Sequence, residues 1–195
     1  RRGIVSVDLD RWKEAQRYEQ RTWMEKGKWA STDRNDHHRE RFTGYVVLRG
    51  YSFERGIELG CGPFTNMRYL LTSCNVESVF LLDPLIDEYL HHRFCKYPRG
   101  RLGGILNERL SRLPKYLWRP FKALRSKRND WRLGGLLGRA VTTVSSTIEG
   151  FETDLRFDLV VMINVLEHCR DAEAVLEKID EILVPGGVLI YHENR

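Results

Sequence analysis

The chain has 195 residues, of which 42% are hydrophobic and 30% charged, and its formal net charge is +5. This length and composition suit a single α/β domain with a sizeable core and exclude a membrane-protein composition. No window approaches the roughly 18 to 20 apolar residues that cross a bilayer, and the start lacks the apolar core of a secretory signal, so we expect a cytoplasmic protein.

Two helices are predicted before the first strand. The first runs from Asp10 to about Lys28 and the second from Asp33 to Leu48, each with aromatic residues among charged ones. Asp8 or Asp10 can cap the first helix, because a short side-chain acceptor satisfies the free amides of a first turn. Residues 1–50 are therefore predicted to form an N-terminal helical segment.

Five short apolar runs follow, separated by helical segments. Runs rich in Val, Ile and Leu that alternate with helices are typical of a parallel sheet covered on both faces, so we predict a doubly wound α/β fold. The strands are expected at Gly56–Leu59, Ser78–Leu82, Ala140–Ser145, Phe157–Ile163 and Gly187–Tyr191. The helices are expected at Phe64–Thr72, Pro84–His91 and Asp171–Leu183, the last ended by Pro185-Gly186-Gly187.

One connection is much longer than the others, since about fifty residues precede the third strand. A loop of that length without structure is uncommon in a compact domain, so this insertion, about residues 92–139, should hold helices near Leu102–Leu113 and Tyr116–Arg128. Between His91 and Ala140 there are 14 Lys and Arg and two acids, a local net charge of +12 against −7 for the rest. An acidic body therefore carries a basic segment.

Three interpretations of the basic insertion stay open. Its Arg and Lys residues are interleaved with aromatic ones, as expected for contact with RNA phosphates and stacked bases. The same composition suits a helix lying on an anionic membrane surface. The third interpretation is a solvated helical cap that shapes a substrate pocket.

The first strand ends in Glu58-Leu59-Gly60-Cys61-Gly62, an acid followed by closely spaced glycines. Such a turn brings bare backbone amides against a ligand. The second strand ends at Asp83, whose carboxylate can accept from ribose hydroxyls or cap the next helix at Pro84. A third glycine is absent, and Pro63 removes a donor that a pyrophosphate needs, which argues against NAD and FAD. A ligand with an adenosine and no phosphate fits better.

Four segments stand in order along the chain: Ile57–Gly62, Leu81–Asp83, Phe157–His168 and Leu183–Ile190. In this order and spacing they resemble the first, second, fourth and following motifs of the class I S-adenosylmethionine-dependent methyltransferases. The resemblance covers roughly residues 56–191 and leaves the basic insertion unmatched. It implies a mostly parallel Rossmann-like sheet of order 3-2-1-4-5, with S-adenosyl-L-methionine as cofactor and S-adenosyl-L-homocysteine as product.

The resemblance also implies a cofactor site built from the glycine turn and the ends of the other strands. Its candidate residues are Glu58, Gly60, Cys61, Gly62, Asp83, Thr147, Ile148 and Asn164. The turn would hold the methionine part, Asp83 the ribose, and Ile148 the adenine through its backbone, while Asn164 would close the site. Near Thr147 the family often carries an acid that accepts from the adenine amino group, so this chain departs from the family there.

Methyl transfer from a sulfonium is an in-line displacement, so positioning in a dry pocket supplies much of the rate. A base is needed only when the acceptor is a hydroxyl or a protonated amine. The candidate catalytic residues are His192 and Glu193 at the carboxyl edge of the sheet, with His37 or His38 from the N-terminal helices.

The family resemblance assigns residues 1–50 to a lid and residues 51–195 to the cofactor-binding domain. The lid would fold over the cofactor with four aromatic side chains, Trp12, Trp23, Trp29 and Tyr45. The family's sheet continues past the fifth strand, whereas this chain ends at Arg195. Because an apolar edge strand is seldom left exposed, we expect later strands to be missing, or a second copy or the N-terminal helices to cover it.

The four cysteines are scattered without a Cys-x-x-Cys pair, which indicates reduced thiols. His91-His92-x-x-Cys95 and His168-Cys169 each lack the second ligand pair of a tetrahedral zinc site, so no metal is expected. The sequence therefore predicts a methyltransferase that acts on oxygen or nitrogen of a small molecule. The alternatives are an RNA methyltransferase that uses the basic insertion, and a non-catalytic cofactor-binding module.

Overall fold

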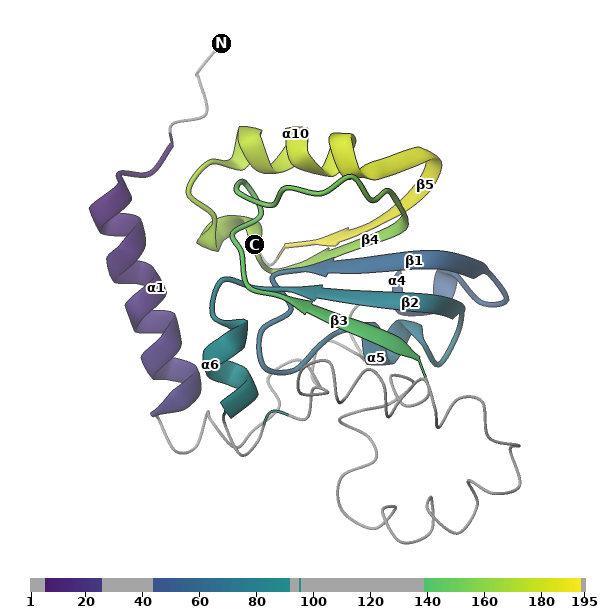
Figure 1. The fold of residues 1–195 in the computed structure, drawn as a ribbon, viewed down its shortest axis with the longest axis horizontal. Coiled ribbons are helices and arrows are strands. Elements are labelled where there is room, and N and C mark those ends of the chain that lie inside the picture. Colours follow the sequence, from purple (N-terminus) through teal and green to yellow (C-terminus); the bar gives the residue numbers. More distant parts are fainter. Residues whose placement is uncertain (1–5, 26–43, 92–94, 96–138, 194–195) are drawn as a thin grey trace, which may run out of the picture.

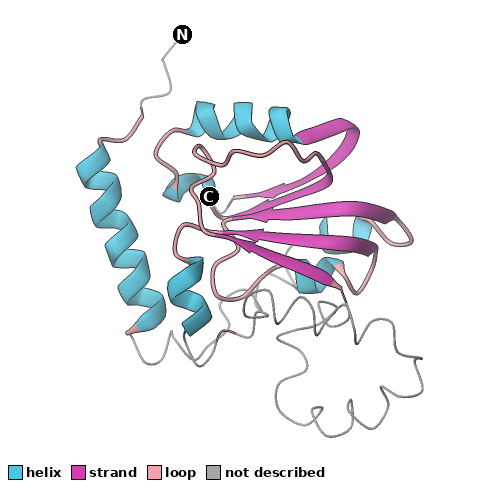
Figure 2. Cartoon of the chain, viewed as in Figure 1, coloured by secondary structure: helices cyan, strands magenta, loops and turns pink. Residues whose placement is uncertain are grey.

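The computed structural model describes residues 6–25, 44–91, 95 and 139–193. Five strands form one parallel sheet in the order β3-β2-β1-β4-β5, with helices on both sides (Figure 2). The strands are β1 (Ser52–Leu59), β2 (Asn75–Leu82), β3 (Ala140–Val144), β4 (Phe157–Ile163) and β5 (Leu183–His192). The predicted fold class and strand order are confirmed.

Two hydrophobic clusters lie on opposite faces of the sheet, because successive side chains of a strand point to opposite sides. Leu159 and Val161 belong to one cluster, and Val160 and Met162 to the other. The second is covered by α10 (Ala172–Ile182), whose buried residues Val175, Ile179 and Ile182 follow helical spacing. Asp171 caps this helix by accepting from the amides of Glu173 and Ala174.

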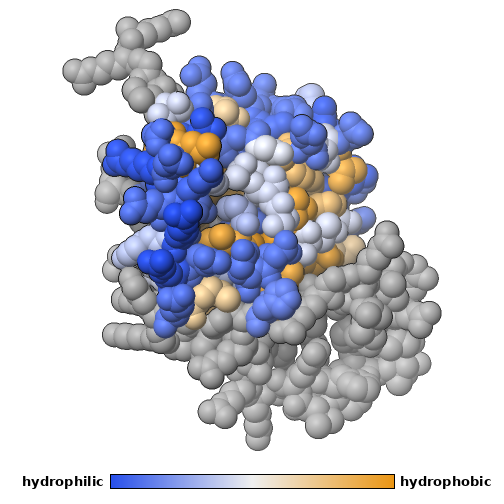
Figure 3. Space-filling model, turned by 60° about the vertical axis from the view of Figure 1, so that its left-hand side comes forward, coloured by the Kyte–Doolittle hydropathy of each residue, from blue (hydrophilic) through white to orange (hydrophobic). Residues whose placement is uncertain are grey.

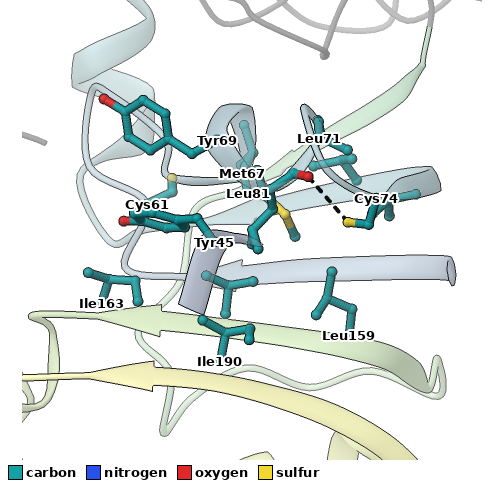
Figure 4. Packing of buried hydrophobic residues seen from close by; sticks show 14 of the residues in the cluster. Tyr45, Cys61, Met67, Tyr69, Leu71, Cys74, Leu81, Leu159, Ile163 and Ile190 are labelled. Atoms are coloured by element: carbon teal, nitrogen blue, oxygen red, sulfur yellow. Dashed lines mark hydrogen bonds between the residues drawn. The ribbon is translucent and has the colours of Figure 1, made fainter. Parts of the chain in front are cut away.

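The first cluster lies on the side of three short helices, α4 (Gly44–Val47), α5 (Met67–Leu70) and α6 (Ile86–His91). Figure 4 shows its side chains, with the Cys74 thiol donating to the carbonyl oxygen of Leu70 over 3.4 Å. Tyr45, predicted as a lid residue, is buried in this cluster and donates to Asn66 Oδ1 at 2.8 Å. It holds the loop after the glycine turn and does not face the cavity described below.

The strand β1 begins earlier than its apolar run predicts. Its first residues alternate between exposed and buried positions, a pattern that charged Glu54 and Arg55 hide from a search for apolar runs. The amides of these two residues donate to the Asp158 carboxylate at 2.7 and 2.9 Å. At the start of β4 the Asp158 carboxylate therefore takes the place of backbone carbonyls as the acceptor for these two amides.

The end of α10 differs from the prediction. The helix ends at Ile182, and Leu183 already pairs with Phe157 of β4. The ladder resumes at Leu159 and Val188, so Pro185-Gly186-Gly187 forms an irregularity within β5, with Gly186 at φ 80°. Proline and glycine suit this position because a bulge leaves amides unpaired and admits a positive φ.

The helix α1 (Leu9–Met24) begins after Asp8, which accepts from the amides of Asp10 and Arg11. It stands beside the edge at which the strands end (Figure 1), and Figure 3 shows a largely hydrophilic outer surface on this side. Of the second predicted helix, only the end at α4 belongs to the described ranges. His37, His38, Trp29 and the helices of the basic insertion lie outside them.

Within the described ranges β5 forms an edge of the sheet, and α1 stands at the strand ends instead (Figure 1). Coverage of this edge by a second copy of the chain stays a prediction. None of the described helices combines the length and apolar character needed to span a bilayer.

Candidate active site

A cavity opens at the carboxyl ends of the strands, beneath α1. Its walls come from α1, the glycine turn, the start of α6, the loop after β3 and the segment after β4. Seven of the eight predicted cofactor residues line it: Gly60, Cys61, Gly62, Asp83, Thr147, Ile148 and Asn164. The topology therefore brings together side chains that are up to about a hundred positions apart in the sequence.

The glycine turn needs its glycines for two different reasons. Gly60 and Gly62 both have positive φ, at 69° and 56°. A Cβ on Gly60 would lie 2.5 Å from a methyl carbon of Val165, whereas a Cβ on Gly62 would meet nothing within 4 Å. Gly60 thus permits close packing against the segment after β4, and Gly62 leaves open space beside the cavity.

The amides of this turn are used within the protein. Those of Gly60 and Cys61 donate to the Leu82 carbonyl at 2.8 and 3.1 Å, and that of Gly62 donates to Asp83 Oδ2 at 2.9 Å. The expectation of bare amides facing a ligand is therefore wrong, because the turn curls onto the end of β2 and its N–H groups find partners there. A turn whose amides at Gly60, Cys61 and Gly62 are already bonded is poorly suited to a pyrophosphate.

Asp83 is the main polar group on this wall. Oδ2 accepts from Gly62, Oδ1 accepts from the Leu85 amide at 2.9 Å, and the residue is 8% exposed. Burial raises its pKa to about 6 against the opposing effect of the two hydrogen bonds, with smaller increases from Glu19 and Glu88. Each carboxylate oxygen keeps a second lone pair, so Asp83 can hold the turn and still accept from a diol.

Glu58 lies behind the turn and is fully buried. Its carboxylate accepts from the Thr65 hydroxyl, the Asn66 amide at 2.9 Å, the Asn66 side chain at 3.0 Å and the Met67 amide at 3.1 Å. Burial raises the pKa of Glu58, and these hydrogen bonds oppose the rise. The structure thus gives Glu58 the role of fixing the loop, and it is not among the residues that line the cavity.

The loop after β3 uses its polar groups on itself. Thr147 Oγ1 accepts from the Gly150 amide at 3.1 Å, and Ile148 is buried at 3% exposure. Glu149 also lines the cavity, two positions after the Thr147 site, but one of its carboxylate oxygens accepts from the amides of Arg170 and Asp171. An acid is therefore near the expected adenine contact, with one oxygen already bonded.

Asn164 closes the end of β4 in a strained conformation. It has φ 54°, the one described non-glycine residue with a positive φ, and its amide donates to the His192 carbonyl at 2.7 Å. Such local strain persists where the surroundings fix it, and it clusters at ligand sites. This placement favours the predicted role of Asn164 at the rim.

The predicted catalytic residues His192 and Glu193 do not line the cavity. Glu193 Oε1 accepts from the amides of Val165 and Leu166 at 3.0 and 2.8 Å, which caps the short 3-10 helix η3 (Leu166–His168). A catalytic role for either residue stays a prediction, and the geometry gives Glu193 a structural one.

Glu193→Ala is expected to lower the melting temperature by roughly 2 to 12 °C, because two amides lose an acceptor worth about 1–3 kcal/mol. Glu193→Gln keeps an acceptor oxygen and should melt close to the unchanged chain. Differential scanning calorimetry of both variants checks this. Equal melting temperatures for all three proteins would show that the carboxylate does not support η3.

One face of α1 supplies cavity residues, of which the sequence analysis predicted the two tryptophans as lid residues and missed Gln16 and Glu19. Trp12, Gln16, Glu19 and Trp23 line the cavity. Trp12 Nε1 and Gln16 Nε2 donate to the His168 carbonyl at 3.0 and 3.3 Å, and the ring of Trp23 lies 5.9 Å from that of Phe64. The spacing of four, three and four positions marks one helix face, so Gln16 and Glu19 could have been found between the two tryptophans.

No grouping of three or more His, Cys, Asp or Glu that could hold a metal ion occurs within the described ranges. The cysteines Cys61, Cys74, Cys95 and Cys169 form no disulfide. Burial raises the pKa of Cys169 to about 12, so this cavity thiol is not a nucleophile at neutral pH.

Comparison with known proteins gives one family and a consistent fold. Residues 121–189 match a model described as a methyltransferase domain. The N-methyltransferase NodS from Bradyrhizobium japonicum, solved with S-adenosylhomocysteine, is 19% identical with a TM-score of 0.52, over 91% of this chain and 70% of that one. No curated protein sequence matches the chain.

A second solved structure is the 1,6-didemethyltoxoflavin-N1-methyltransferase of Burkholderia thailandensis, with its substrate and S-adenosylhomocysteine bound. It is 16% identical with a TM-score of 0.50, over 95% of this chain and 66% of that one. At these identities the likeness concerns the fold. The domain match spans the third motif segment and most of the fourth, and the fold agrees with the resemblance drawn from all four.

Proposed function

We propose that this chain, which has the Rossmann-like fold and the domain match of the class I methyltransferases, is an S-adenosylmethionine-dependent methyltransferase of a small molecule. The observation that carries the proposal is the Asp83 carboxylate, which faces the cavity while it fixes the glycine turn. The two solved neighbours are named as N-methyltransferases, which supports a nitrogen acceptor.

The residues of the cavity fit an adenosine that carries no phosphate. Asp83 keeps lone pairs for a ribose diol, the open space beside Gly62 leaves room for a chain next to the turn, and buried Ile148 offers an apolar wall. When bound, S-adenosylmethionine supplies a methyl group on a sulfonium sulfur. The chain's own part is to orient this donor and to exclude water, for which α1 covers the cavity.

Calorimetric titration with S-adenosylmethionine and S-adenosylhomocysteine tests the proposal. We expect both to bind at a single site, with affinity that depends on Asp83. If neither ligand binds the folded chain, the proposed function fails.

The affinity for S-adenosylmethionine should decrease as the pH falls through about 6. The charged form of Asp83 accepts two hydrogen bonds from a diol, and protonation removes one acceptor, so Kd should rise by about tenfold per pH unit below the pKa. Titrations between pH 5 and 8 measure this, and a Kd that is constant from pH 7 to pH 5 would contradict it.

The stability of the ligand-free chain should respond to Asp83 in the opposite direction. Its pKa is raised on folding from 3.8, so its contribution to stability is complete below that value and is lost as the pH rises through about 6. Because the ligand binds more tightly when Asp83 is ionised, the rise in melting temperature that it produces should be larger at pH 7 than at pH 5.

The RNA interpretation rests on the basic insertion, which lies outside the described ranges. The described lining instead holds Glu19, Asp83, Glu149 and Glu167 and no Lys or Arg, which is unfavourable for a phosphodiester chain. An RNA electrophoretic mobility shift at two salt concentrations separates an RNA substrate from a small-molecule substrate, because phosphate contacts weaken steeply with salt.

A further inference from the structure

The carboxylate of Glu19 is an acid in the cavity wall without an internal task. Glu19 lies in α1, is half-buried and lines the cavity. In the described part of the chain it forms no hydrogen bond and no ion pair. A carboxylate without a partner in the protein can accept from a ligand that supplies a donor or a cation.

The other acids of the wall already have partners within the protein. Asp83 accepts from two amides, and an oxygen of Glu149 accepts from two more. Glu167 pairs with His168 at 3.5 Å and is mostly exposed. Glu19 is thus the acid of the described lining whose carboxylate has no hydrogen-bond or ion-pair partner in the protein.

The charge of Glu19 acts inside the cavity. It contributes to the raised pKa values of both Asp83, directly after β2, and Tyr89, on α6. No Lys or Arg stands among the lining residues that the structure describes, so no cation of the wall offsets this charge. The charged side chains of the described lining are therefore mainly acidic, which favours a positively charged group beside them.

The face of α1 that carries Glu19 also carries two tryptophans. Trp12 and Trp23 line the same cavity, seven positions before and four positions after Glu19. Aromatic faces attract cations and pack against apolar parts of a ligand. A carboxylate flanked by two indole rings on one helix face can bind an amine, because both groups attract positive charge.

We infer that Glu19 is a specificity residue that gives the reacting centre a negative potential and thereby selects a nitrogen acceptor over an anionic oxygen acceptor. This inference rests on the proposed function. A neutral amine nitrogen donates its lone pair to the methyl carbon, the carbon–sulfur bond breaks with its electron pair going to sulfur, and nitrogen takes the positive charge. The methylated nitrogen then releases a proton to water.

The negative potential favours this course because a cation is present at every stage. A phenolate or carboxylate acceptor would instead bring a second negative charge beside Glu19, with no Lys or Arg in the described lining to hold it. The class of substrate is therefore a primary, secondary or heteroaromatic amine.

Two cofactor analogues isolate the charge at the reacting centre. S-adenosylhomocysteine has a neutral sulfur there, and sinefungin has an ammonium group on carbon in the place of the sulfonium methyl. Both keep the same ribose, adenine and amino-acid groups. The ratio of their dissociation constants, measured by calorimetry at pH 7, reports the potential at the position of the transferred methyl group.

In the unchanged chain sinefungin should bind more tightly than S-adenosylhomocysteine. Glu19→Gln should reduce this preference by about fivefold to tenfold, a value discounted for the partial exposure of Glu19, and should leave the S-adenosylhomocysteine affinity within about twofold. Glu14→Gln is the matched control, because Glu14 is an exposed acid of the same helix outside the cavity lining. It should leave the ratio unchanged.

The outcomes separate the inference from the proposed function. If neither analogue binds, the proposed function fails. If both bind and Glu19→Gln does not change their ratio, or weakens both equally, Glu19 does not act at the reacting centre and the inference is overturned. Thermal melting of each variant confirms that the chain is folded at the temperature of the titration.

Discussion

Asp83→Asn is expected to bind S-adenosylmethionine about 100-fold more weakly than the unchanged chain. Two hydrogen bonds from a diol to a charged, nearly buried carboxylate contribute roughly 1.5–3 kcal/mol each, and an amide can accept only at its single oxygen. Calorimetric titration at pH 7.5, where the carboxylate is ionised, gives the comparison with the largest contrast.

Asparagine is preferred to alanine because Asp83 also supports the fold. Its two oxygens accept from Gly62 and Leu85, so asparagine frees one of these amides, whereas alanine would free both and mix a loss of binding with a looser turn. Asp87→Asn is the control, since Asp87 is an exposed acid of the adjoining helix α6. Equal affinities for the two variants would remove Asp83 from the ligand site.

Gly60→Ala is expected to destabilise the folded chain by about 2–4 kcal/mol, from a positive φ together with overpacking. The new Cβ would lie 2.5 and 2.6 Å from the two γ-methyl carbons of Val165, a branched side chain that cannot swing both aside. For a chain of this length the melting temperature should fall by roughly 5 to 15 °C.

Two further variants divide this effect into its causes. Gly62→Ala has the same sign of φ but open space around its Cβ, so it should lose only about 1–2 kcal/mol. Adding Val165→Ala to Gly60→Ala removes the methyl groups that the new Cβ meets, so the two changes should be less than additive. Equal losses for Gly60→Ala and Gly62→Ala would show that contact with Val165 is unimportant.

The sequence predicts strand ends best where the strand is buried on both faces of the sheet. The run Phe157–Ile163 matches β4 at both ends, because six of its seven residues are buried. At β1 and β2 the apolar run marks only the part of the strand nearest the site, since the outer residues alternate with solvent. Strand ends at the cavity are thus predicted better than strand ends far from it.

The site could be predicted as a set of positions but not as a set of contacts. Spacing places Asp83 and Asn164 at the same edge of the sheet, and the structure brings both to the cavity. The spacing does not reveal that Glu58 turns inward to Thr65 and Asn66, or that the amides of the glycine turn donate to the end of β2. These outcomes depend on the path of the loop in three dimensions.

Two side chains of α1 donate to the same acceptor, the His168 carbonyl. They are the indole of Trp12 and the side-chain amide of Gln16. A small rotation of that peptide would weaken both bonds at once, while Trp23 packs on Phe64 and holds the other end of the helix. His168 ends η3, whose first amides are held by Glu193 at the far end of β5. The position of α1 over the cavity therefore depends, through η3, on the Glu193 carboxylate that follows β5.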